Sequence, residues 1–146
     1  MNQQQEFIKA TGRVLIEKIF PDGSRETLRV ANTVVNVGKN FIASRMVNAD
    51  AIISHVAVGT GNTGVQATDT ALQTQLARVA LSGGTVSNNV VTYTATIPAG
   101  TGTGALVEAG LFNNSTGGTM LARTTFAVVN KGASDSIAIT WTVTIN

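Results

Sequence analysis

The sequence predicts a mainly β protein: an antiparallel β-sandwich of the jelly-roll kind, with one short helix and an N-terminal β-hairpin. In residues 90–98 and 136–145, apolar side chains alternate with threonine or alanine, the period-two pattern of a strand with one buried face. Segments rich in Gly, Asn, Asp and Ser separate the apolar stretches at intervals of about ten residues. Short strands at this spacing are typical of sandwiches and related antiparallel barrels.

The chain begins with a predicted hairpin. Residues 12–20 (GRVLIEKIF) and 25–35 (RETLRVANTVV) both have the composition of strands. The sequence between them, Pro-Asp-Gly-Ser at 21–24, is a strong turn signal because Asp and Gly both suit tight turns. We therefore expect these two strands to pair with each other.

A single helix is predicted after this hairpin, over residues 37–47. Asn36 is placed to cap its N-terminus, and Met46 extends its apolar stripe. The positions with helical spacing are Val37, Phe41, Ile42 and Arg45. We expect the apolar face to pack on the sheet, which is more common than binding a partner.

Charge divides the chain into two parts. Of the 18 charged residues, 12 lie in residues 1–50, so we place a boundary near Asn48. Residues 1–48 form the hairpin and helix, which we interpret as an attachment arm packed on the main domain. Residues 49–146 form the predicted β-sandwich domain. Both parts together have the size of one ordinary domain.

The second part opens with a predicted buried strand at 51–58 and a glycine-rich segment at 59–64. That segment contains a GxGxxG pattern, but a dinucleotide site also needs a following helix and alternating β-α units. Only one or two helical turns are predicted next, within 68–76, where Thr70 and Gln73 form a weak capping pattern. We therefore interpret the glycines as a surface loop. Two further strands are predicted at 78–86 and 90–98, followed by a flexible loop at 99–104.

The strongest hairpin in the sequence lies in residues 105–126 and organises the rest of the chain. Its arms, 106–112 and 120–126, flank an Asn- and Gly-rich turn. Glu108 and Arg123 lie at similar distances from that turn, so a cross-strand ion pair is plausible, and we interpret it as a solvated surface pair. In the final strand, Trp141 is on the apolar side and is predicted to lie in the core.

The sequence offers little chemistry. It has no cysteine, one histidine (His55) and few, dispersed carboxylates, and it lacks the P-loop, GxSxG and HExxH motifs. A lone histidine in an apolar run is interpreted as structural. We therefore predict no enzyme activity, no catalytic residues, no metal and no cofactor. A net charge of +2 without a basic aromatic cluster argues against nucleic acid. No apolar run is long enough for a membrane span, and the N-terminus has no Sec signal core.

Low charge predicts assembly. Charged residues make up 12% of the chain, about half the usual share. Thr, Ala, Gly and Asn occupy the surface instead, and a neutral threonine face packs against a copy of itself without desolvating ions. We therefore expect the chain to associate with copies of itself, a trimer being the first guess.

One series of motifs carries a resemblance to a known family. HVAVGTG, TDTAL, VVTYTATIPAGTGTGALVEAGLFN and GGTMLARTTFAVVNKGASDSIAITWTV follow one another in this order. The series resembles small structural proteins of tailed-bacteriophage virions, over most of the chain from about Val34 onward. The resemblance implies a virion protein made in the host cytoplasm, with major capsid or tail proteins as partners. Because 146 residues form a compact module with no fibre repeat, we favour a head decoration or cement protein in many copies within that class. The alternative is a tail-fibre, collar or neck component, with contact to a host receptor left open.

Overall fold

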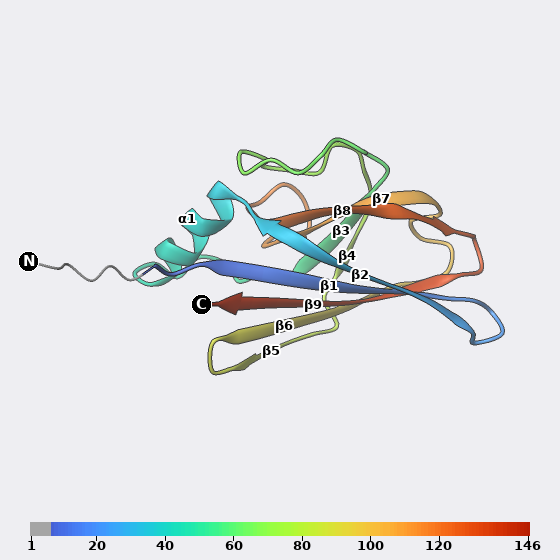
Figure 1. Ribbon diagram of the computed structural model, residues 1–146, viewed down its shortest axis with the longest axis horizontal. Helices are drawn as coiled ribbons and strands as arrows, with labels where there is room; N and C mark the ends of the chain where they lie inside the picture. The colour runs from blue at the N-terminus through green and yellow to red at the C-terminus, as the bar shows by residue number, and fades with distance from the viewer. Residues whose placement is uncertain (1–6) are drawn as a thin grey trace, which may run out of the picture.

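The strands of this protein form one antiparallel sheet, described for residues 7–146 by a computed structural model (Figure 1). Its nine strands lie in the order β4-β3-β7-β8-β2-β1-β9-β6-β5. The elements in chain order are β1 (Ala10–Ile19), β2 (Arg25–Val34), α1 (Asn36–Arg45), β3 (His55–Gly59), β4 (Gln75–Ala80), β5 (Gly83–Ser87), β6 (Val90–Ile97), β7 (Gly104–Phe112), β8 (Met120–Lys131) and β9 (Ser136–Ile145). The prediction of a mainly β protein is confirmed, and α1 is the one helix in residues 7–146.

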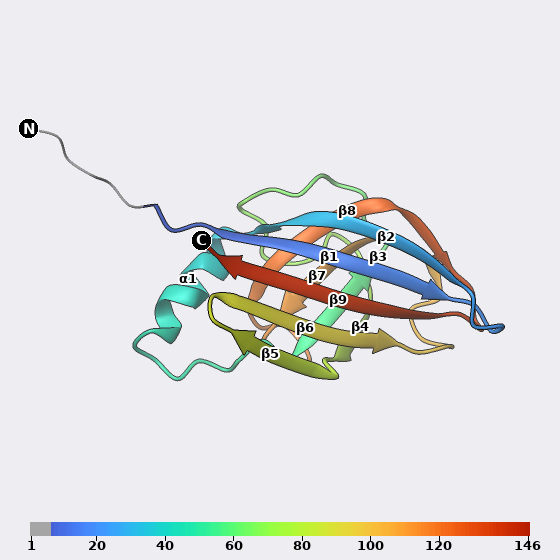
Figure 2. The same cartoon turned by 60° about the horizontal axis from the view of Figure 1, so that its bottom comes forward.

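The sheet is curled into a half-barrel, so the jelly-roll sandwich that the sequence predicted is not confirmed. Figures 1 and 2 show the two halves of the sheet curving around a common interior. The bend lies at β2, which pairs along most of its length with β1 but meets β8 only through Thr33 and Val34. Strand spacing and alternation locate individual strands, but they do not show whether a strand such as β2 joins two layers into one sheet.

The N-terminal hairpin is confirmed, and it occupies the middle of the sheet. β1 lies between β2 and β9, while β2 continues the sheet toward β8. In the turn, the Asp22 carboxylate accepts hydrogen bonds from the backbone N–H and hydroxyl of Ser24, which lower the pKa of Asp22. Gly23 has a φ of 87°, which glycine adopts without strain. The predicted boundary near Asn48 falls after α1, and strands from both sides of it pair within this sheet.

Helix α1 packs on the sheet through its backbone as well as its side chains. A Cβ added at the buried Gly38 would lie 2.1 Å from the carbonyl oxygen of Leu121 in β8, so the helix can approach this closely only with glycine there. Phe41 and Ile42 contact the core. Two details of the prediction are wrong: Asn36 is inside the first turn and Val35 holds the N-cap position without a side-chain bond, while Met46 is 84% exposed.

The segment after α1 differs most from the prediction. β3 begins at His55 instead of residue 51, and residues 68–76 contain no helix. The predicted strand at 78–86 is two strands, β4 and β5, which lie at opposite edges of the sheet. Leu81 and Ser82 connect them, and the Ser82 N–H donates to the Thr94 carbonyl. A link of two residues therefore ties the two edges of the curled sheet together.

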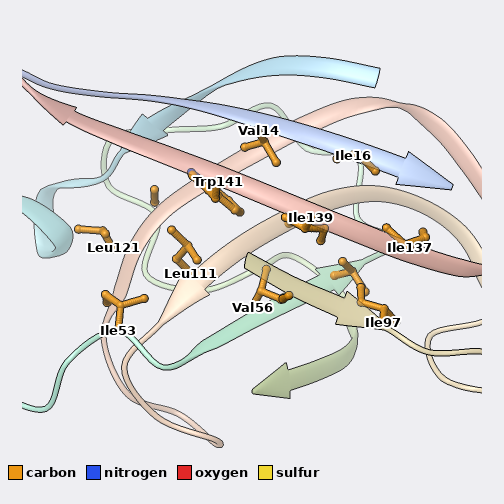
Figure 3. Packing of buried hydrophobic residues seen from close by; sticks show 14 of the residues in the cluster. Val14, Ile16, Ile53, Val56, Ile97, Leu111, Leu121, Ile137, Ile139 and Trp141 are labelled. Atoms are coloured by element: carbon orange, nitrogen blue, oxygen red, sulfur yellow. The ribbon is translucent and has the colours of Figure 1, made fainter. Parts of the chain in front are cut away.

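The hairpin of β7 and β8 and the final strand β9 match the prediction. Their inward side chains fill the interior with residues from β1, β3 and β6 (Figure 3). Trp141 is fully buried, as predicted, and its Nε1–H donates to Oδ1 of Asn32 over 3.0 Å. Gly12 leaves the space that Asn32 occupies, since a Cβ there would lie 1.7 Å from Oδ1 of Asn32. On β9, each buried residue from Ile137 to Val143 is followed by a half-buried one, which confirms one apolar face and one threonine-rich face.

Candidate functional site

The most highly charged place in the interior is a cluster of three ionic side chains. Arg123 on β8 donates to Glu108 on β7 over 2.7 Å and to Asp69 over 2.9 Å. Glu108 is 0% exposed and Arg123 is 2% exposed, so the predicted pair exists but its interpretation as a solvated surface pair is wrong. The sheet register pairs Glu108 with Thr125 and Gly110 with Arg123, so the ions meet diagonally. Burial strengthens the electrostatic attraction between these charges. It also means that removing one partner would leave an uncompensated charge in the interior, which destabilises the fold.

This cluster fixes the long segment between β3 and β4, residues 60–74, which has no regular secondary structure. The carboxylate of Glu108 accepts from the backbone N–H groups of Gln73 and Thr74. The guanidinium of Arg123 donates to the carbonyl of Thr63. A segment of this length needs such anchors to hold one conformation. We call residues 60–74 the anchored loop.

Two of the three glycines of the GxGxxG pattern, Gly59 and Gly61, make room for this cluster. A Cβ at Gly59 would lie 2.5 Å from Oε1 of Glu108, and a Cβ at Gly61 would lie 2.9 Å from Oε2. Both glycines are buried, although we predicted that the segment would be a surface loop. Gly64 has open space around it and is exposed, which agrees with that prediction. The pattern therefore makes room for a carboxylate instead of approaching a phosphate. Sequence reasoning missed Asp69 and these contacts because the cluster joins residues far apart in the chain.

Three further ionisable groups, His55, Lys131 and Arg78, are held in structural contacts. His55 is half-buried, and its Nδ1 lies 2.8 Å from the hydroxyl of Ser54. Lys131 is buried and donates to the Pro98 carbonyl, while Arg78 lies over the Phe112 ring. Among residues 7–146 no group of three or more His, Asp or Glu side chains is placed to hold a metal ion. These contacts position strands and turns.

Helix α1, residues 7–9 and the end of β9 lie at the same end of the molecule (Figures 1 and 2). An apolar patch is exposed there. Ile8, Ile42, Met46 and Ile145 line a shallow groove of about 490 Å³ there, with Lys9 and Lys39 beside them. Ile8 is 79% exposed and Met46 is 84% exposed. Phe7 and Val47, the chain neighbours of Ile8 and Met46, are exposed as well. We call Ile8, Ile42, Met46 and Ile145 the terminal apolar patch.

The outer face of the sheet forms a second distinctive surface. Threonines lie opposite one another on neighbouring strands from β1 to β5. Thr11 on β1 pairs with Thr144 on β9. Thr142 on β9 pairs with Thr92 on β6, and Thr92 pairs with Thr85 on β5. The charged side chains on this face belong to β1 and β2, such as Arg13 and Arg29. From β9 outward the face is neutral, as the sequence predicted.

No protein-family model, no curated protein and no solved structure matches this chain. Within residues 7–146, no helix has the length and apolarity needed to cross a membrane.

Proposed function

We propose that this chain is a non-enzymatic structural protein of a bacteriophage virion, made in the host cytoplasm and assembled in many copies. Within that class we favour a head decoration or cement protein, and the alternative is a tail-fibre, collar or neck component. The motif resemblance from Val34 onward motivates the virion assignment. The observation that supports an assembly role best is the terminal apolar patch.

The terminal apolar patch has the character of an attachment surface. Ile8 and Met46, which are 79% and 84% exposed, line the same groove, and their chain neighbours Phe7 and Val47 are 73% and 88% exposed. Contiguous exposed apolar surface rimmed by polar groups is typical of protein interaction sites, whereas single exposed apolar residues are ordinary. Lys9 and Lys39 at its margin would keep the free protein soluble and orient an acidic partner surface. We therefore assign attachment to this end, as the sequence-based idea of an N-terminal attachment arm suggests.

The polar groups of the interior are consistent with a structural role. Glu108 accepts three hydrogen bonds, from Arg123, Gln73 and Thr74. A carboxylate held in this way is not available as a general acid or base, since a catalytic group must reach a substrate. The assignment as a non-enzyme thus has support from the best-formed polar cluster in residues 7–146.

Attachment can be tested with substitutions that leave the sheet intact. Removing residues 1–35 would delete β1 and β2 from the middle of the sheet, so loss of binding after that truncation would only report unfolding. The variant Ile8→Glu/Met46→Glu places two carboxylates in the patch. The matched control is Val128→Glu, on β8, where Val128 is 54% exposed.

The assay measures binding of purified protein to particles of the encoding phage that lack it. We expect wild type and Val128→Glu to bind alike and Ile8→Glu/Met46→Glu to lose at least about tenfold in affinity, because each buried charge without a partner costs more than 1 kcal/mol. Equal binding by all three proteins would remove the terminal apolar patch from the proposal. Immunogold labelling of complete particles then separates head from tail, and an absence of label from every particle would refute the virion assignment. A tail-tip location together with binding to host cells would favour the receptor-contacting alternative.

A further inference from the structure

Strand β5 leaves one side of the sheet open. Gly83–Ser87 pairs with β6 in an uninterrupted five-residue register, and no strand of residues 7–146 pairs with its other side. Figures 1 and 2 both show β5 along the margin of the molecule. All five of its residues are exposed. In an antiparallel ladder alternate residues direct both backbone groups outward, so this edge presents N–H and C=O groups that lack a protein partner.

Nothing on β5 protects this edge from pairing. Natural edge strands are usually blocked by charge, proline or a bulge. The sequence has no charged residue between Arg78 and Glu108, and β5 has no proline and no irregularity in its register. The opposite edge strand, β4, carries Arg78, whose guanidinium donates to the carbonyls of Asn114 and Gly117. Of the two edge strands, β4 therefore carries a charge and has a register shift in its pairing with β3 at Val58 and Gly59, whereas β5 has neither.

The side chains beside β5 add an apolar groove to the open edge. Ile52, Val86 and Tyr93 help to line a groove of about 430 Å³ on the concave side of the sheet. Val86 is 71% exposed and Ile52 is 65% exposed. Gly84 has no side chain, and a Cβ there would lie 3.5 Å from the Tyr93 ring, so the ring is open on the side that faces the edge. A bulky apolar group next to Gly84 would cover it.

We propose that β5 pairs in antiparallel fashion with β5 of a second copy, about a two-fold axis that passes through Thr85. Only the register that places Thr85 opposite Thr85 pairs all five residues of both strands. In that register Val86 of each copy lies opposite Gly84 of the other, where it covers Tyr93. The two β5 surfaces are thus complementary in shape, because Val86 of one copy fills the space at Gly84 of the other, and both surfaces are uncharged.

A second copy fits this edge better than a charged partner. A strand that carries Lys, Arg, Asp or Glu would have to desolvate these groups against a surface with no counter-charge, whereas a second β5 brings none. Five paired residues extend about 17 Å and bury less than the about 800 Å² per partner of a typical stable complex. We therefore expect a weak pair, populated at high protein concentration or where copies are held close together. The inference rests on the edge itself and stands whether or not the chain belongs to a virion.

Cysteine cross-linking tests the register directly, because the protein has no cysteine of its own. Residues directly opposite in an antiparallel pair have Cα atoms about 4.5–5.5 Å apart, within the range that a disulfide spans. We expect Thr85→Cys to form a covalent dimer under mild oxidation at millimolar protein. The matched control is Thr96→Cys, an exposed position on the same face but one strand away from the edge. Equal cross-linking of the two variants, or none with Thr85→Cys, would overturn the proposal.

A charge experiment tests the two-fold axis. In sedimentation at high concentration, Thr85→Lys and Thr85→Glu should each stay monomeric, since like charges then lie opposite each other at the axis. A mixture of the two should form pairs again, because Lys then lies opposite Glu. Thr96→Lys should associate as wild type does. A wild type that stays monomeric at millimolar concentration would refute the contact, and pairs that persist in Thr85→Lys alone would place association elsewhere on the molecule.

Discussion

Replacing Arg123 by methionine should destabilise the protein by about 3–5 kcal/mol, the usual effect of removing one partner from a buried ion pair. Methionine keeps much of the apolar stem of arginine but removes three donated hydrogen bonds, to Glu108, Asp69 and the Thr63 carbonyl. Glu108 would then remain 0% exposed with a negative charge and only two backbone donors. The loss is large because the orphaned charge has no access to water.

Urea unfolding followed by Trp141 fluorescence measures this change, since Trp141 is the sole tryptophan and is buried. Glu108→Gln and the double variant complete a thermodynamic cycle, in which we expect a coupling free energy of about 1–3 kcal/mol. The matched control is Arg25→Met, which breaks the exposed pair of Arg25 with Glu17 and should cost about 1 kcal/mol or less.

Protease digestion gives a second readout of the same cluster. Arg123→Met should increase cleavage within the anchored loop, residues 60–74, before global unfolding, because Arg123 holds Thr63 and Asp69 directly. A loss of stability no larger than that of Arg25→Met, or a coupling energy of zero, would show that the cluster does not stabilise the fold.

Three further predictions concern single positions. Trp141→Ala should cost about 3–5 kcal/mol by circular dichroism, because it empties a fully buried site; a near-neutral effect would contradict this packing. Gly38→Ala should cost about 1–3 kcal/mol through its clash with the Leu121 carbonyl, whereas Gly64→Ala, which meets open space, should be near neutral. Tyr93 is the sole tyrosine, and burial raises its pKa above 10.0, so an ultraviolet titration should have its midpoint above that value. The contribution of neutral Tyr93 to the free energy of unfolding should be fully present below pH 10 and should be lost as the pH rises through the pKa of Tyr93 in the folded protein. A titration midpoint at pH 10 would show that the ring is solvated.

Local pattern was sufficient to predict most individual strands. Alternation in β9 identified its buried face, including Trp141, because a strand that covers a core on one side must place apolar residues at every second position. The turn at Asp22 and Gly23 could also be predicted from the sequence, since its conformation depends on residues within the turn itself. Both features are decided by interactions between residues that are close in sequence.

Features decided by distant contacts could not be predicted in the same way. The segment from residue 78 to 86 is interrupted by Ser82, Gly83 and Gly84, but local pattern does not show that Leu81 and Ser82 carry the chain from one edge of the sheet to the other. Glu108 and Arg123 were visible as a pair, but their burial depends on the anchored loop, which folds over them from a separate part of the sequence. The terminal apolar patch likewise joins residues near both ends of the described chain.

The position of β9 has a consequence for synthesis on the ribosome. Four hairpins, β1–β2, β3–β4, β5–β6 and β7–β8, are each local in sequence, but β9 alone joins β1 to β6. Until the segment up to Ile145 has left the ribosome, the hairpin of β5 and β6 cannot join the centre of the sheet. The nascent chain therefore exposes an open edge on β1 from the time β1 has emerged, and a second one on β6 from the time β6 has emerged, until β9 follows. Because pairing of β1 with β9 spans nearly the whole described chain, completion of the sheet should be slow and should coincide with the emergence of β9.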